Sequence, residues 1–108
     1  MASLQEEQGP IDLEVAGAIV ACVPESWRSA ELSAERVTEP GGGERHQLTI
    51  RNPDGRTEVV VPTAEVMLAV RKLALVFARH GHPWSKAMYL LSQDDGGDWD
   101  FVARFAYA

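Results

Sequence analysis

Apolar residues recur at helical spacing near the start of the chain, in two adjoining stripes: Ile11, Val15, Ile19 and Cys22, and Leu13, Val20 and Val23. This spacing predicts a helix that is apolar over more than half of its circumference and must be covered by other elements. Gly9-Pro10 is expected to open the helix, because a proline in the first turn loses no hydrogen bond, and Pro24 is expected to end it. We expect the polar residues 1–8 to form a flexible tail.

The pattern then changes from helical to alternating, which predicts a strand over residues 27–37 with one apolar and one water-facing side. The apolar side holds Ala30, Leu32 and Ala34, and the polar side holds Ser29, Glu31, Ser33 and Glu35. Residues 45–51 alternate in the same way. Asn52-Pro53-Asp54-Gly55 is a strong turn signal, so we expect a third strand over residues 57–61 to fold back on the second.

A second helix is predicted to begin at Pro62-Thr63, where the Thr63 hydroxyl can cap the free N–H groups. Its expected buried stripe consists of Val66, Val70, Leu73 and Phe77. Gly81 and Pro83 are expected to end the helix, because glycine accepts the left-handed conformation and proline cannot continue the hydrogen bonding.

The last stretch, residues 83–107, is typical of a β-hairpin, with alternating runs on either side of a turn rich in Asp and Gly. A two-residue turn at Asp95-Gly96 would place Leu90 opposite Phe101 and Trp84 opposite Tyr107. The inner face would then hold Trp84, Met88, Leu90, Trp99, Phe101, Phe105 and Tyr107. A turn at Gly96-Gly97 would keep this face assignment, because a two-residue change of register preserves the alternation.

These elements predict an α+β protein in the order α-β-β-β-α-β-β, with two helices packed on an antiparallel sheet of about five strands. The 108 residues leave room for one domain, which we place at residues 9–108. The sequence has no signal-peptide pattern and no apolar run long enough to span a membrane, so we expect a cytoplasmic protein.

Ten basic and sixteen acidic side chains give a formal net charge of −6. This charge opposes binding to nucleic acid or to an anionic membrane and favours a basic partner. The densest group of carboxylates lies at the hairpin turn, and a second group lies on the polar side of the first strand. We expect partner binding by these residues: Asp94, Asp95, Asp98, Asp100, Glu31 and Glu35.

Patterns that would indicate catalysis are missing from the sequence. There is no nucleophile motif or phosphate-binding loop, and the single cysteine, Cys22, falls in the first apolar helix. His80 and His82 could hold a metal with His46 or an aspartate, but their number and spacing differ from those of structural zinc sites. We therefore expect no enzyme activity, no cofactor and no metal.

Three clusters of residues resemble the YezG-like immunity proteins, which are antitoxins that neutralise the nuclease domains of secreted polymorphic toxins. The clusters are Val23-Pro24-Glu25-Ser26-Trp27, His82-Pro83-Trp84-Ser85, and Gly97-x-Trp99 through Phe105-x-Tyr107. The resemblance runs from Ile11 to Tyr107 and implies a non-enzymatic protein that binds a basic cognate toxin. Members of the family often continue with an acidic, partly helical tail, whereas this sequence stops at Ala108. A scaffold or regulatory interaction domain without a toxin partner is the alternative.

Overall fold

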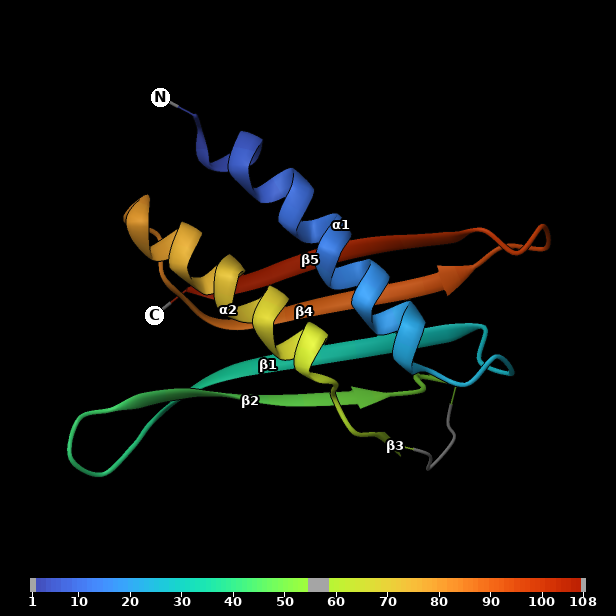
Figure 1. Ribbon diagram of the computed structural model, residues 1–108, viewed down its shortest axis with the longest axis horizontal. Helices are drawn as coiled ribbons and strands as arrows, with labels where there is room; N and C mark the ends of the chain where they lie inside the picture. The colour runs from blue at the N-terminus through green and yellow to red at the C-terminus, as the bar shows by residue number, and fades with distance from the viewer. Residues whose placement is uncertain (1, 55–58, 108) are drawn as a thin grey trace.

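Two helices lie on one face of a twisted antiparallel sheet in the computed structural model, which describes residues 2–54 and 59–107 (Figure 1). The elements are α1 (Leu4–Cys22), β1 (Ser29–Thr38), β2 (Glu44–Arg51), β3 (Val59–Val60), α2 (Ala64–Arg79), β4 (Trp84–Gln93) and β5 (Trp99–Tyr107). Neighbouring strands follow the order β3-β2-β1-β4-β5, and every pair is antiparallel. The predicted α+β class, with two helices and an antiparallel sheet, is confirmed.

The sheet differs in detail from the prediction, because the third strand is much shorter than expected. Four strands are eight to ten residues long, whereas β3 has only two residues and pairs with the end of β2. Of the third strand expected over residues 57–61, Val61 lies outside the strand and is 85% exposed. Gly55 of the predicted turn and residues 57 and 58 lie outside the described residues.

The first helix begins at Leu4, five residues before the predicted start at Gly9-Pro10, so the expected tail over residues 1–8 is largely helical. The reason is a capping box: the Ser3 hydroxyl accepts from the Glu6 N–H, and the Glu6 carboxylate accepts from the Ser3 N–H. Pro10 therefore lies inside α1, where its missing N–H costs the helix one backbone hydrogen bond. The Thr63 cap of α2 is confirmed, since its hydroxyl accepts from the Val66 N–H.

The core lies between the helices and the sheet. The predicted apolar side of β1 is fully buried, and the predicted stripe of α2 is buried as well, so both patterns are confirmed. The helix-facing residues buried on β1 and β4 combine three alanines with three large side chains, namely Ala30, Leu32, Ala34, Ala87, Tyr89 and Leu91. Trp27 at the end of the α1–β1 connection and Trp84 at the start of β4 complete the core at 1% and 2% exposure.

The β4–β5 hairpin differs from its predicted register by one residue, and its face assignment is therefore partly wrong. Leu90 pairs with Val102, and Leu91 pairs with Phe101. The Asp94 and Asp98 backbones close a loop of three residues, in which Gly97 takes a positive φ of 89°. Such a loop shifts the register by one residue relative to a two-residue turn, and a one-residue shift exchanges the two faces of a strand.

A bulge near the start of β4 changes the alternation a second time. The register shifts between Trp84 and Lys86, so that Trp84 still pairs with Tyr107 as predicted. Trp84 thus shares the helix-facing side with Ala87 and Tyr89, whereas Met88 and Leu90 lie on the opposite side. Of the predicted inner face, Trp84, Trp99, Phe101 and Phe105 contact the core, but Met88, Leu90 and the 57% exposed Tyr107 do not belong to it.

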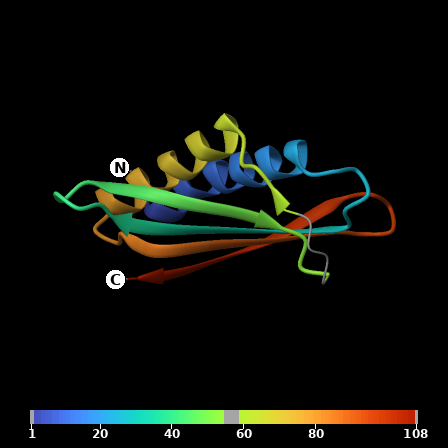
Figure 2. The same ribbon diagram turned by 90° about the horizontal axis from the view of Figure 1, so that it is seen from below.

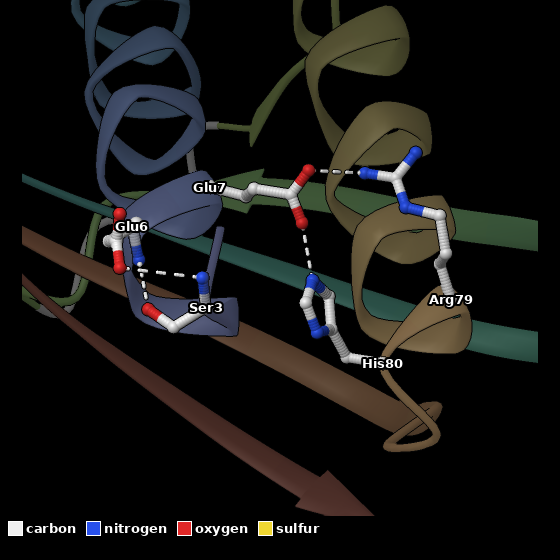
Figure 3. Close-up of polar contacts among 5 residues, drawn as sticks. All are labelled: Ser3, Glu6, Glu7, Arg79 and His80. Carbon is white, nitrogen blue, oxygen red and sulfur yellow. Dashed lines mark hydrogen bonds and ion pairs between the residues drawn. The ribbon is translucent and has the colours of Figure 1, made fainter. Parts of the chain in front are cut away.

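Charged pairs join the two helices side by side. Glu7 of α1 accepts from Arg79 at 2.6 Å and contacts His80, both at the end of α2 (Figure 3). About two helical turns away, Lys72 Nζ of α2 lies 2.8 Å from Glu14 Oε1 of α1. Hydrogen bonding to His80 is the largest influence that lowers the pKa of Glu7, and the positive charge of Arg79 adds to it.

A polar contact also links α1 to the sheet below it. The Tyr89 hydroxyl donates to Asp12 Oδ1, and Gln8 Nε2 donates to Asp12 Oδ2 at 3.0 Å. Burial raises the pKa of Asp12, although both hydrogen bonds oppose the rise, and burial together with Asp12 raises the pKa of Tyr89. The contact satisfies a hydroxyl that would otherwise be buried without a partner, because Tyr89 is fully buried.

We predict that Glu7→Gln makes the stability of the protein less dependent on pH. A carboxyl whose pKa is lowered on folding stabilises the protein above its unfolded pKa of about 4.3, and this stabilisation is lost as the pH falls through the folded pKa. The melting temperature of wild type should therefore exceed that of the variant near pH 6, and the two should converge as the pH falls through the folded pKa of Glu7. Glu25→Gln, in an exposed loop, is the control and should follow wild type. Parallel curves for wild type and Glu7→Gln would contradict the assignment.

Candidate protein-binding site

The sheet face opposite the helices is covered by no other element among residues 2–54 and 59–107 (Figure 2). The strand registers and the alternation within each strand assign its side chains. We call this surface the open face; it consists of Glu31, Ser33, Glu35, Gln47, Thr49, Arg51, Lys86, Met88, Leu90, Ser92, Asp100, Val102, Arg104 and Ala106. A sheet with one bare face is a surface that a partner can cover directly.

The middle of the open face is apolar. Leu90 lies between Glu31 of β1 and Val102 of β5 in the register, and Met88 lies next to it along β4. Met88 and Leu90 are half-buried, whereas Val102 is 55% exposed. Charged side chains flank this centre on both sides, which is the arrangement of a small apolar centre with a polar rim that protein interfaces use.

Glu31 is buried on the open face, contrary to the prediction that it faces water. Its side chain is 10% exposed and binds Arg51 on β2, with Oε1 3.0 Å from Nη2 and 3.1 Å from Nε. The reason is its place on the central strand, where side chains of both neighbouring strands cover it. Glu35, the other predicted residue of β1, stays exposed, and its carboxylate lies 3.6 Å from Lys86. Of the two, Glu35 is the accessible one.

The hairpin loop uses one of its predicted binding residues for its own structure. Asp94 Oδ1 accepts from the N–H groups of Gly96 and Asp98, each at 2.9 Å. The three other carboxylates, of Asp95, Asp98 and Asp100, are exposed and have no hydrogen bond or ion pair within the described part of the chain. Asp94 is therefore a structural residue of the loop, and the other three are available to a partner.

Other carboxylates join the hairpin loop through the fold. The loop lies at the same end of the molecule as the start of β1 and the end of β2 (Figure 1). Asp54 reaches this end and accepts from the Ser29 hydroxyl at 3.1 Å, while the Gln93 N–H donates to the carbonyl of Arg28. We call this region the acidic end; its carboxylates are Glu25, Asp54, Asp94, Asp95, Asp98 and Asp100.

Sequence reasoning missed Glu25 and Asp54, because they lie 40 or more positions from the hairpin loop in the chain. Their nearness follows only from the pairing of β1 with both β2 and β4. Two arginines also lie at this end, but Arg51 is paired with Glu31, which leaves Arg28 as the cation without an ion pair in the described ranges. The acidic end thus has a clear excess of negative charge.

The three histidines are separated by the fold. His80 contacts Glu7, the His82 ring lies against Tyr107, and the His46 ring lies 5.3 Å from that of Trp84. Among the described residues, no three His, Cys, Asp or Glu side chains group in a way that could hold a metal ion. In the same part of the chain, neither helix is both long enough and apolar enough to cross a membrane.

Comparison of the sequence with known proteins found no matching family model and no matching curated protein.

We predict that Asp94→Ala destabilises the hairpin loop, whereas Asp95→Ala does not. The first change leaves two backbone N–H groups without their acceptor, so it should cost about 1 to 2 kcal/mol, whereas Asp95 bonds to nothing in the described chain. Urea unfolding of both variants measures the difference. Equal stability of the two variants would show that the Asp94 carboxylate does not hold the loop.

Proposed function

We propose that this protein is a non-enzymatic immunity protein that binds a basic cognate toxin of the nuclease class through the acidic end and the adjoining open face. The observation that carries the proposal is the group of exposed carboxylates of Asp95, Asp98 and Asp100, which no basic side chain in the described chain neutralises. Carboxylates held apart from internal cations keep their full attraction for a cationic partner.

The electrostatics suit a nuclease in particular. A nuclease must bind phosphates, so its substrate-binding face is basic, and an acidic protein can occupy that face. The net charge of −6 extends the attraction beyond direct contacts, and its concentration at one end orients the approach. The same charge argues against nucleic acid or a membrane as the partner.

The open face supplies what charge alone does not. Opposite charges chiefly raise the association rate, whereas a long-lived complex also needs apolar surface to be buried at its centre. Met88, Leu90 and Val102 provide such surface next to the acidic end, since Ser92 and Asp100 pair directly beyond Leu90 and Val102. The resemblance of the three motif clusters to YezG-like immunity proteins agrees with this mode of action.

The second candidate is a scaffold or regulatory interaction domain without a toxin partner. It rests on the same open face, whose apolar centre would suit any protein with a complementary surface. Co-expression with the toxin encoded next to this gene distinguishes the two. An immunity protein should restore growth and co-purify with the toxin, and failure of both would remove the toxin from the proposal.

For the toxin complex, we predict that Asp95→Asn with Asp98→Asn slows association about tenfold at low salt and leaves dissociation nearly unchanged. Charges at the rim of an interface act mainly on the encounter, and salt screens them, so the difference should shrink at high salt. Glu44→Gln with Glu65→Gln removes the same charge from exposed sites away from the acidic end and is the matched control. Association rates that fall equally in both double variants would show that net charge, and not the acidic end, directs binding.

A further inference from the structure

A groove of about 700 Å³ lies on the helix-bearing side of the molecule, away from the open face. One wall is the flank of α2, and the other is formed by the helix-facing side of β1 and β2, with Trp84 between them. The groove exists because the two helices cross the sheet diagonally and leave uncovered the corner of the sheet at the start of β2, which we call the β2 corner (Figure 1). Neither the acidic end nor the open face contributes to it.

The α2 wall is apolar along its length. Met67, Leu68 and Leu75 line the groove and are 54%, 59% and 61% exposed, although they lie on a helix whose other side is already buried in the core. Leu68 and Leu75 are two turns apart, which is about 10 Å along the helix axis. Isolated exposed apolar residues need no explanation, but a stripe of them along one wall of a groove is typical of a docking surface.

Arginines flank this apolar stripe. Arg71 stands between Leu68 and Leu75 on α2, and Arg36 reaches the groove from β1. Neither has an ion pair in the described part of the chain, whereas Arg45 at the groove is paired with Glu39. The positive charges of Arg36 and Arg71 both reach His46 on β2. Burial lowers the pKa of His46, and these two charges lower it further, whereas the charge of Glu44 raises it. Two cations without partners thus converge on an apolar groove in an acidic protein.

Charge decides between a second copy of this chain and a different protein as the occupant. In a two-fold symmetric dimer the same surface meets itself, so the unpaired Arg36 and Arg71 of both copies would be brought into one interface. Like charges across a partly buried interface are unfavourable. An occupant that carries carboxylates beside apolar residues complements both the arginines and the apolar wall of the groove.

The shape of the wall favours a helix as the occupant. Leu68, Arg71 and Leu75 follow the spacing i, i+3, i+7 of one face of a helix, and two packed helices lie about 8 to 10 Å apart. A helix in the groove would extend the layer of α1 and α2 across the β2 corner. We propose that this groove binds an amphipathic helix of another protein, with acidic residues beside its apolar stripe.

The first experiment selects ligands from a display library of helical peptides with randomised surface positions, using the full-length protein as bait. We expect enrichment of peptides that combine a Leu-rich stripe with Glu or Asp at flanking positions. Selection on Arg71→Glu should lose these peptides and enrich peptides with Lys or Arg in their place. Absence of enrichment, or enrichment of the same peptides on both baits, would overturn the proposal.

The second experiment measures one selected acidic peptide by fluorescence anisotropy. Arg71→Glu should weaken its binding at least tenfold, and the same peptide with Lys in place of Glu should bind Arg71→Glu better than it binds wild type. Arg104→Glu, a charge reversal on the open face, is the matched control and should leave both affinities within twofold of wild type. Equal weakening by the two variants would show a non-specific charge effect and would contradict the groove.

Two further readouts locate the peptide. Leu75→Ala should weaken binding without lowering the melting temperature, because Leu75 is mostly exposed in the free protein. Chemical-shift changes should follow α2 and the helix-facing residues of β2. Changes confined to the unpaired edge of β2 would show strand addition instead, and concentration-dependent dimerisation that Arg71→Glu alters would assign the groove to a second copy; either result would overturn the proposal.

Discussion

The alternation of side chains along β4 is the constraint on which the rest of the structure depends, because it decides which residues enter the core and which lie on the open face. Two irregularities set it: the three-residue loop shifts the hairpin register by one residue, and the bulge between Trp84 and Lys86 brings Trp84 back to the helix-facing side. Between these points, Ala87, Tyr89 and Leu91 face the helices, and Met88 and Leu90 face away. The opposite alternation would bury Met88 and Leu90 and would place Tyr89 and Leu91 on the open face instead.

Burial on the helix side is supported by specific polar contacts. The Tyr89 hydroxyl finds Asp12 on α1, and Glu7 binds the end of α2, so the two helices are fixed to the sheet and to each other. Such contacts contribute modestly to stability, since each replaces a hydrogen bond with water, and the helices are held on the sheet mainly by burial of the apolar core. That placement leaves the β2 corner uncovered and creates the groove beside α2. The two candidate surfaces are therefore separate, and their charges are opposite.

Much of the fold could be predicted from local patterns. The Thr63 cap, the buried stripe of α2 and the buried side of β1 follow from periodicity and capping, which are properties of neighbouring residues. The hairpin faces could not be predicted in this way. A two-residue turn at Asp95-Gly96 and a three-residue loop closed by Asp94 and Asp98 both suit the sequence, and they give registers that differ by one residue. The start of α1 was missed since the capping box of Ser3 and Glu6 outweighs the interruption by Pro10.

The candidate sites show the same limit. The carboxylates of the hairpin loop were evident in the sequence, but the burial of Glu31 beside Arg51 and the addition of Glu25 and Asp54 to the acidic end depend on strand pairing between distant residues. The groove beside α2 also had no local signal. Met67, Leu68 and Leu75 are ordinary apolar residues in a helix, and only the positions of β1 and β2 show that they remain uncovered.

The stabilities of Leu90→Ala and Leu91→Ala test the face assignment most directly, because the two residues are adjacent, chemically identical and assigned to opposite sides of β4. Leu91 is 3% exposed in the core, so its truncation should cost about 2 to 5 kcal/mol in urea unfolding. Leu90 is half-buried on the open face, and its truncation should cost less than about 1 kcal/mol. A larger loss for Leu90→Ala than for Leu91→Ala would show that the opposite alternation is correct and would contradict the open face as described.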